Sequence, residues 1–138
     1  MDPTLSVTIN DNHIKRITKT NSDKGVKFLG VVLDEHLTWS MHIDYLCTKI
    51  SRAIFAINMA KNELTYSALL TFYYALIESQ LIYGISIWGS GSAIQRLEKL
   101  QKRAIRTIFK LPYRAHCDPL FKQHNIFKLG DHYKMNLA

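Results

Sequence analysis

Basic side chains recur along one stretch in the second half of this sequence. Residues 92–114 contain seven Lys or Arg residues and a single acid, Glu98, whereas residues 1–91 contain eight basic and eight acidic residues and sum to zero charge. Lys and Arg on one rigid face can contact successive phosphates, so this stretch favours binding of a polyanion. The candidate nucleic-acid-binding side chains are Arg96, Lys99, Lys102, Arg103, Arg106 and Lys110.

The alternative for this basic stretch is a solvated helix face, which is the commoner role of surface lysines. A face that serves solubility usually mixes both charge signs in pairs four residues apart. Glu98 is the only acid in the stretch. The pattern therefore favours nucleic-acid contact over a solvated face.

The other reactive residue types indicate no catalytic or metal site. Metal-assisted phosphoryl chemistry needs paired carboxylates, and the only adjacent acids, Asp34-Glu35, follow an apolar run and are typical of a turn. His116-Cys117, His124 and His132 match no zinc-binding spacing. We predict no catalytic residue, no metal ligand and no cofactor in this chain.

The bulk composition describes one small domain with a core. The chain has 138 residues, 47% of them apolar, and a net charge of +7. Cys47 and Cys117 are far apart, which favours a reduced, intracellular compartment, and no signal peptide is expected. Glu78 is the only charged residue between 64 and 95, and it leaves charge-free runs of 14 and 17 residues. Both are shorter than the roughly 20 residues of a membrane span, so we expect a buried core helix and no membrane partner.

The N-terminal quarter has the pattern of short strands. Residues 5–10 alternate and are β-branched, Asp11-Asn12 favours a turn, and residues 13–19 complete a predicted β-hairpin. Residues 26–33 read as a third, more buried strand. Gly30 inside that strand indicates a bulge or a close approach by another backbone or a ligand.

The rest of the chain has the pattern of helices. Apolar residues at three- and four-residue spacing predict a helix over 40–60, and Thr65 is a plausible N-cap for a second over 65–83. That second helix is apolar on almost every side, so we expect neighbours on several faces and Trp88 in the core beyond it. Ser92 and Gln95 have capping-box spacing for a third helix that continues to about 111, where Pro112 stops it.

Two shorter helices are expected near the C-terminus, around 119–124 and from about 131. The aromatic residues of the second long helix could stack on bases, but their spacing within an apolar helix is more typical of a core. These residues are Phe72, Tyr73, Tyr74 and Tyr83.

Several blocks of the sequence, in order, resemble the reverse transcriptases of non-LTR (LINE-type) retrotransposons. The first is Val26–Asp34, with Phe28-Leu29-Gly30 at its centre, followed by Leu37-Thr38-Trp39 and His42-Ile43. The later blocks are Tyr73–Leu81, Tyr83-Gly84-Ile85, Trp88-Gly89, Leu100–Arg106, Pro119-Leu120-Phe121 and Leu129-Gly130-Asp131. The resemblance covers about residues 5–135, and it is to the C-terminal primer-grip and thumb region of these enzymes.

The resemblance implies an α+β fold, mainly α. A small N-terminal β-hairpin plus a strand would lead into a three-helix thumb-like bundle with short C-terminal helices. Residues 1–36 would form the end of the palm and residues 37–138 the thumb-like domain. Phe28, Leu29 and Gly30 would be primer-grip-like, holding the 3′ end of the primer, while the thumb helices track the template–primer backbone.

In this family, catalysis rests on palm aspartates that bind magnesium upstream of the primer grip. No Asp-Asp pair occurs in the chain, so we expect it not to polymerise DNA alone. The expected function is that of part of an RNA-directed DNA polymerase, contributing template–primer binding. Its partners would be RNA–DNA or DNA duplex, and the missing palm region or a second copy at the exposed strand edge.

Two other functions remain open from the sequence. One is a stand-alone nucleic-acid-binding helical module with no preference for a duplex form. The other is a protein-interaction bundle whose basic stripe docks an acidic partner. A thumb should prefer a primer–template hybrid, whereas an interaction bundle should bind nucleic acid weakly.

Overall fold

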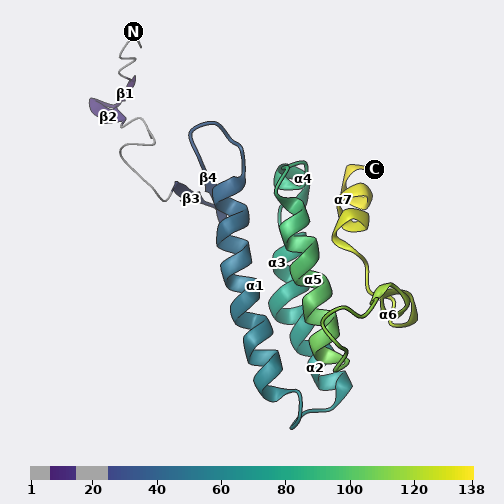
Figure 1. The fold of residues 1–138 in the computed structure, drawn as a ribbon. Helices are drawn as coiled ribbons and strands as arrows, with labels where there is room; N and C mark the ends of the chain where they lie inside the picture. The colour runs from purple at the N-terminus through teal and green to yellow at the C-terminus, as the bar shows by residue number, and fades with distance from the viewer. Residues whose placement is uncertain (1–6, 15–24) are drawn as a thin grey trace.

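The computed structural model describes residues 7–14 and 25–138. Figure 1 shows long helical rods side by side, with short hairpins at the N-terminal end of the chain and the short C-terminal helices on the side of the bundle opposite the first rod. The predicted class, α+β and mainly α, is confirmed. The strands are β1 (Val7–Ile9), β2 (Asn12–Ile14), β3 (Val26–Phe28) and β4 (Val31–Leu33). The helices are α1 (Ser40–Ala60), α2 (Tyr66–Tyr73), the π-helical η1 (Tyr74–Glu78), α3 (Ser79–Ile82), α4 (Ile85–Trp88), α5 (Ile94–Ile108), α6 (Asp118–Gln123) and α7 (Leu129–Leu137).

The strands form two separate antiparallel pairs. β1 pairs with β2 around a turn at Asn10-Asp11, one residue earlier than predicted, and the predicted strand residues 15–19 lie outside the described residues. The prediction of one continuous strand over 26–33 is wrong. Residues 26–33 form a hairpin in which Phe28 pairs with Val31. Its turn residues Leu29 and Gly30 have φ of 47° and 82°, the two positive values that a type I′ two-residue turn requires.

Helix α1 has the bounds that the apolar spacing predicted. It buries one face, and the buried His42 in its first turn bonds to β4. The imidazole Nδ1 of His42 accepts a hydrogen bond from the backbone N–H of Val32 at 3.2 Å. The same ring packs against Trp88, with 5.4 Å between ring centroids. His42 therefore joins the hairpin, α1 and the segment around α4.

The second rod is continuous but not uniformly α-helical. Thr65 is its N-cap as predicted, because its Oγ1 accepts a hydrogen bond from the Ala68 N–H at 3.3 Å. A stripe at every fourth position is buried completely, formed by Leu69, Tyr73, Ile77 and Leu81. Every-fourth residues drift around a regular α-helix, which has 3.6 residues per turn. The π turn η1 holds more residues per turn and brings the stripe back onto one face.

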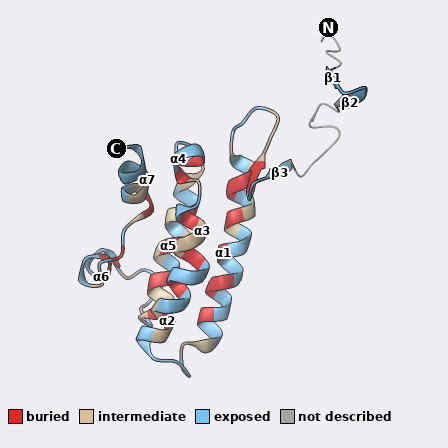
Figure 2. Cartoon of the chain, turned by 180° about the vertical axis from the view of Figure 1, so that it is seen from behind, coloured by how far each residue is buried: buried red, intermediate tan, exposed pale blue. Residues whose placement is uncertain are grey.

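The rod contacts α1, α5 and α7, so it has the several neighbours that were expected, but these neighbours do not bury all of its apolar sides. Phe72, Tyr74 and Tyr83, predicted to lie in the core, are exposed, and so are Leu76 and Ile82. Of the four aromatic residues in that prediction, Tyr73 is buried. These neighbours cover one stripe of the rod and leave its other positions exposed (Figure 2).

The segment between the second and third rods differs from the prediction. The structure forms the short helix α4 there, which was not expected from the sequence. Trp88 is buried as expected, and its indole N–H donates to the carbonyl of Tyr83 at 2.9 Å. The capping box at Ser92 is wrong, because α5 begins at Ile94 after Ala93 and has no side-chain cap.

Helix α5 stops three residues before the predicted end. The face that it buries is formed by Leu97, Gln101, Ala104, Ile105 and Ile108. The Leu111 N–H donates to the Arg106 carbonyl at 2.9 Å and the Lys110 N–H to the Thr107 carbonyl at 3.3 Å. This pair of hydrogen bonds is a Schellman motif, in which the residue after the cap is left-handed. Lys110 occupies that position with φ of 55°.

The C-terminal helices pack on the side of α5 away from α1 (Figures 1 and 2). Helix α6 lies where predicted, and α7 begins two residues earlier than expected. Each is anchored by a buried apolar residue, Phe121 in α6 and Leu129 in α7. No helix in the described part of the chain is long and apolar enough to cross a membrane.

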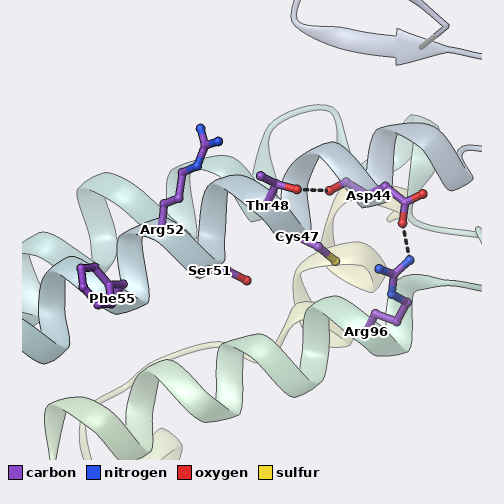
Figure 3. A pocket seen from close by; sticks show the side chains of 7 residues that line it. All are labelled: Asp44, Cys47, Thr48, Ser51, Arg52, Phe55 and Arg96. Atoms are coloured by element: carbon purple, nitrogen blue, oxygen red, sulfur yellow. Dashed lines mark hydrogen bonds and ion pairs between the residues drawn. The ribbon is translucent and has the colours of Figure 1, made fainter. Parts of the chain in front are cut away.

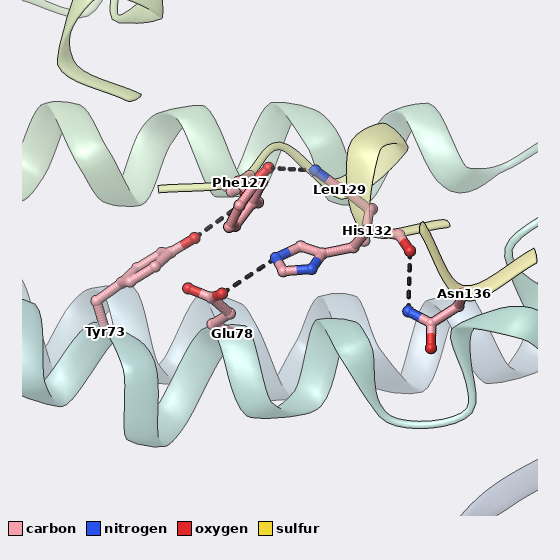
Figure 4. A network of polar contacts seen from close by, with 7 residues as sticks. Tyr73, Glu78, Phe127, Leu129, His132 and Asn136 are labelled. Atoms are coloured by element: carbon pink, nitrogen blue, oxygen red, sulfur yellow. Dashed lines mark hydrogen bonds and ion pairs between the residues drawn. The ribbon is translucent and has the colours of Figure 1, made fainter. Parts of the chain in front are cut away.

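A buried amide joins α7 to the bundle. Gln101 is 2% exposed, and its Nε2 donates to the Tyr73 hydroxyl and to the Phe127 carbonyl, both at 2.9 Å. Its Oε1 accepts the Leu129 N–H at 3.0 Å. Figure 4 shows Phe127 and Leu129 beside this network, with the Glu78 carboxylate and the His132 imidazole joined nearby at 3.0 Å. Burial raises the pKa of Tyr73 and that of Glu78, although the His132 charge opposes the rise at Glu78.

Stability should fall in mild acid because of His42. Burial lowers the pKa of the folded His42 below its usual 6.5, so as the pH falls through about 6.5 the unfolded chain takes up a proton first. The free energy of unfolding then falls by up to about 1.4 kcal/mol per pH unit from this one group. Chemical denaturation at a pH of about 7.5 and about 5.5 measures the loss.

The matched variant is His42→Asn, which keeps an acceptor for the Val32 N–H but cannot be protonated. We expect its unfolding free energy to depend less on pH over that range. Equal pH dependence in the two proteins would show that His42 takes up its proton equally in both states.

Replacing Lys110 with glycine should stabilise the fold. A left-handed conformation costs a non-glycine residue about 1–2 kcal/mol, and glycine avoids this cost. Lys110→Gly is therefore expected to raise the free energy of unfolding by about 1 kcal/mol, and Lys110→Ala to leave it unchanged. Thermal unfolding of both variants checks this, and a less stable glycine variant would contradict it.

Candidate nucleic-acid interface

The basic residues of α5 line an open groove between α5 and α1. The two helices run in the same direction, so Asp44 lies beside Arg96 at one end and Lys61 near Lys110 at the other. Figure 3 shows the first end, with side chains of α1 facing Arg96. The central hollow has a volume of about 680 Å³ and is lined by Cys47, Ser51, Arg96, Lys99, Leu100, Lys102, Arg103, Arg106 and Tyr113.

All six predicted binding residues line this groove, but they are not equivalent. The side chains of Lys99, Arg103 and Lys110 are exposed and make no hydrogen bond or ion pair within the described ranges 7–14 and 25–138. Lys102 is half-buried, and its charge contributes to a lowered pKa at Asp118, whose first partner is the Lys128 ammonium. These side chains can reach a ligand without first breaking a short internal contact.

Arg96 and Arg106 have partners within the protein. Arg96 forms an ion pair with Asp44, and the two side chains are 55% and 60% exposed. A pair this exposed is worth little and can be exchanged for a ligand phosphate. The Arg106 Nε–H donates to the Ala115 carbonyl at 2.8 Å, so Arg106 also holds the chain that follows α5.

The groove is nearly free of acidic residues. Asp44 is the one carboxylate among the described residues that line its three adjoining hollows. The other nearby acid, Glu98, faces Gly130 on the α7 side of α5. A cleft lined by one sign of charge concentrates its field and attracts ligands of the opposite sign.

Two basic residues of the groove were not among the predicted binding residues. Arg52 and Lys61 belong to α1 and its C-terminus and line the outer hollows. The apolar spacing of residues 40–60 places Arg52 off the buried face, but that spacing does not reveal which helix lies beside it. Tyr113, in the loop after α5, was also missed because a single tyrosine in a loop carries no pattern.

The primer-grip-like residues form the tip of the β3–β4 hairpin. Phe28 and Leu29 are 61% and 75% exposed. The Tyr83 hydroxyl donates to the Leu29 carbonyl at 2.6 Å, and a Cβ on Gly30 would lie 3.1 Å from the Tyr83 ring. The neighbour of Gly30 is thus the side chain of Tyr83, not the backbone or ligand that was predicted. The positive φ of the turn is a second reason for glycine at this position.

A second contact holds the hairpin on α1. The Lys27 ammonium donates to the Tyr45 hydroxyl at 3.1 Å and lies 5.1 Å from the centre of the Tyr45 ring. Hydrogen bonds from Lys27 and then Lys49 lower the pKa of Tyr45. The hairpin and the Arg96 end of the groove thus lie at the same end of α1.

The acid that follows β4, Asp34, bonds to its neighbours in the sequence. Asp34 accepts hydrogen bonds from the backbone N–H of His36 and of Thr38, each at 3.0 Å, and from the Thr38 hydroxyl at 2.8 Å. Burial raises the pKa of Asp34, but these hydrogen bonds outweigh it and leave the pKa lowered. Across the described residues, no three His, Cys, Asp or Glu side chains are grouped so as to hold a metal ion.

Comparison with known proteins identifies relatives of one kind. The chain is 28% identical over 111 residues to the "RNA-directed DNA polymerase from mobile element jockey" of Drosophila melanogaster, covering 76% of this chain and 12% of that protein. It is 30% identical over 105 residues to the "Probable RNA-directed DNA polymerase from transposon BS" and 31% over 87 residues to that of the X-element, both from the same fly. These matches cover 72% and 59% of this chain, and 12% and 10% of the relatives.

The resemblance inferred from the sequence is confirmed, because these relatives are RNA-directed DNA polymerases of non-LTR retrotransposons. The chain spans about an eighth of the length of these relatives. No protein-family profile and no solved structure matches it significantly.

Substitutions in the hairpin turn should have opposite effects on stability. Gly30→Ala places a Cβ at a left-handed position against Tyr83 and is expected to lower the free energy of unfolding by about 1–2 kcal/mol. Leu29→Gly removes the strain of the other left-handed residue and should raise the free energy of unfolding. Denaturant unfolding of both variants measures the effect.

Tyr83→Phe keeps the ring and removes the hydroxyl, so it isolates the hydrogen bond to Leu29. Because this contact is solvent-exposed, we expect a loss of at most about 1 kcal/mol. A Gly30→Ala variant as stable as the parent would show that the turn adopts another conformation.

Proposed function

We propose that this relative of the non-LTR retrotransposon RNA-directed DNA polymerases binds template–primer duplex. The sugar–phosphate backbone would lie along the groove between α1 and α5. In this proposal the chain acts as the thumb of a polymerase. The metal-binding aspartates that add nucleotides would be supplied by residues other than these 138.

One observation supports this proposal above the others: basic side chains from two helices meet in a groove with a single acid. Six of these basic residues lie in one segment of the sequence. The fold places Arg52 and Lys61 of the neighbouring helix beside them. From Arg96 in α5 to Lys110 just after its end, the basic segment extends about 20 Å at 1.5 Å per residue. That length matches about six base-pair steps of 3.4 Å along one strand.

The hairpin tip supports a second contact in the same proposal. The side chains of Phe28 and Leu29 project into solvent on a turn fixed by Tyr83 and Gly30. An exposed apolar turn on a rigid base suits contact with the sugar or base at the end of a primer strand. It lies at the Arg96 end of the groove, so one duplex could contact both.

The test compares variants that lose two charges inside or outside the groove. Lys99→Gln with Arg103→Gln removes two exposed cations without internal partners. Lys122→Gln with Lys134→Gln removes two exposed cations of α6 and α7 and is the matched control. Fluorescence anisotropy with an RNA–DNA hybrid across a salt series measures affinity and its salt dependence.

We expect the groove variant to bind less tightly and its salt slope to become shallower by about two, since each lost phosphate contact removes about one. The control should bind like the parent. If both double variants lose the same affinity, the loss comes from net charge and not from the groove. If neither loses affinity, the groove is not the binding surface.

The form of duplex preferred separates this proposal from its rivals. A thumb should favour an RNA–DNA hybrid over other nucleic acids of equal length, and a general nucleic-acid module should not. If the folded protein does not bind nucleic acid even at low salt, the remaining candidate partner of the groove is an acidic protein.

A further inference from the structure

Tyr113 stands out among the groove residues because it is aromatic and almost fully in water. Its side chain is 81% exposed, the highest value among the large apolar side chains that the structure describes. It lines both the central hollow and the hollow at the Lys110 end. Its neighbours there include Arg103, Arg106 and Lys110.

The loop that carries Tyr113 is held firmly. Pro112 precedes it with a fixed φ, and the Ala115 N–H donates to the Pro112 carbonyl at 2.9 Å, which closes a turn around Tyr113. The Arg106 Nε–H then donates to the carbonyl of Ala115 at 2.8 Å and fixes the turn to α5. The Tyr113 ring is thus presented by a turn anchored at both ends and contributes nothing to the core.

We propose that Tyr113 is a stacking platform for an unpaired base of the nucleic acid whose phosphates occupy the groove. This inference rests on the proposed function and refines its substrate to a duplex that continues into a single strand. Inside a duplex the base faces are buried in the stack, so a ring that lies along the backbone groove can stack only on a base that is not paired. Aromatic rings set among basic residues are the combination that binds single strands.

The geometry assigns separate roles to the neighbouring side chains. Arg103 and Lys110 would neutralise the phosphates on either side of the stacked base. Arg106 is a positioning residue, because its hydrogen bond to Ala115 sets where the turn holds Tyr113. Stacking uses the face that every base has, so we expect little sequence preference.

The experiment uses three forms of one DNA duplex. The first is blunt, the second has a single-stranded extension, and the third has the same extension built of abasic nucleotides. The abasic extension keeps the phosphates and removes the bases, so the difference between the last two measures stacking alone. Binding is followed by anisotropy with the parent chain, Tyr113→Ala and Tyr113→Phe.

For the parent, we expect the base-containing extension to bind about 5- to 150-fold more tightly than the abasic one, the range of one stacked base. Tyr113→Ala should abolish that difference, and its affinity for the blunt duplex should fall less than its affinity for the base-containing extension. Tyr113→Phe should retain it, because the ring and not the hydroxyl stacks.

A spectroscopic measurement reports the stack directly. A 2-aminopurine base in the extension should lose fluorescence on binding to the parent and to Tyr113→Phe, but not on binding to Tyr113→Ala. The inference is wrong if the parent binds the two extended duplexes with equal affinity. It is also wrong if Tyr113→Ala lowers the affinity for all three duplexes by the same factor.

The groove variant makes the two proposals separable. If Lys99→Gln with Arg103→Gln binds the blunt duplex as tightly as the parent, the proposed function fails, and the inference fails with it. If that variant weakens blunt binding while the two extensions bind the parent alike, the groove is a duplex site and only the stacking inference is wrong.

Discussion

The amide of Gln101 fixes the rotation of α5, and the position of the charged face follows from that rotation. The side chain lies in the middle of an otherwise apolar face and is 2% exposed. Its donors are used by Tyr73 and Phe127, and its oxygen by the Leu129 N–H. A buried polar group without partners costs about 1–3 kcal/mol. Rotating α5 about its axis would break these hydrogen bonds, so this cost opposes the rotation. The same bonds attach α7, which covers the side of α5 that faces away from α1.

The charge of the groove follows from this placement and from the pairing of two parallel helices. With the Gln101 face inward, Lys99 and Arg103 lie on the side toward α1, and Glu98 lies on the side toward α7. The acids therefore end up elsewhere, and Asp44 is left to pair with Arg96 at one end. Like charges in a shared groove repel one another, and a bound polyanion would relieve that repulsion. This is the physical reason why the groove suits phosphates.

The hairpin obtains its place from contacts that are far apart in the sequence. Tyr83 reaches its turn across 54 residues, and the buried ring of His42 reaches β4 from α1. Between them these contacts fix a two-residue turn whose residues are both left-handed. The tip is thus held in place although it is exposed, because β4 buries Val31 and Val32 while β3 stays in solvent. A rigid base under an exposed apolar tip is what a contact with a strand end would need.

The sequence by itself determined the helix over 40–60, the Thr65 cap, the buried position of Trp88, the basic face of α5 and the resemblance to non-LTR reverse transcriptases. Each depends on spacing or chemistry within a short segment, which side-chain periodicity reports directly. The sequence pattern predicted one strand over residues 26–33, where Gly30 in fact serves a turn and not a bulge. It also overestimated the burial of the rod formed by α2, η1 and α3. Only the tertiary structure decided which helix faces α5, and hence that Arg52, Lys61 and Tyr113 share its groove. Periodicity shows which face of a helix is buried, but not what lies beside it, since that depends on contacts between distant segments.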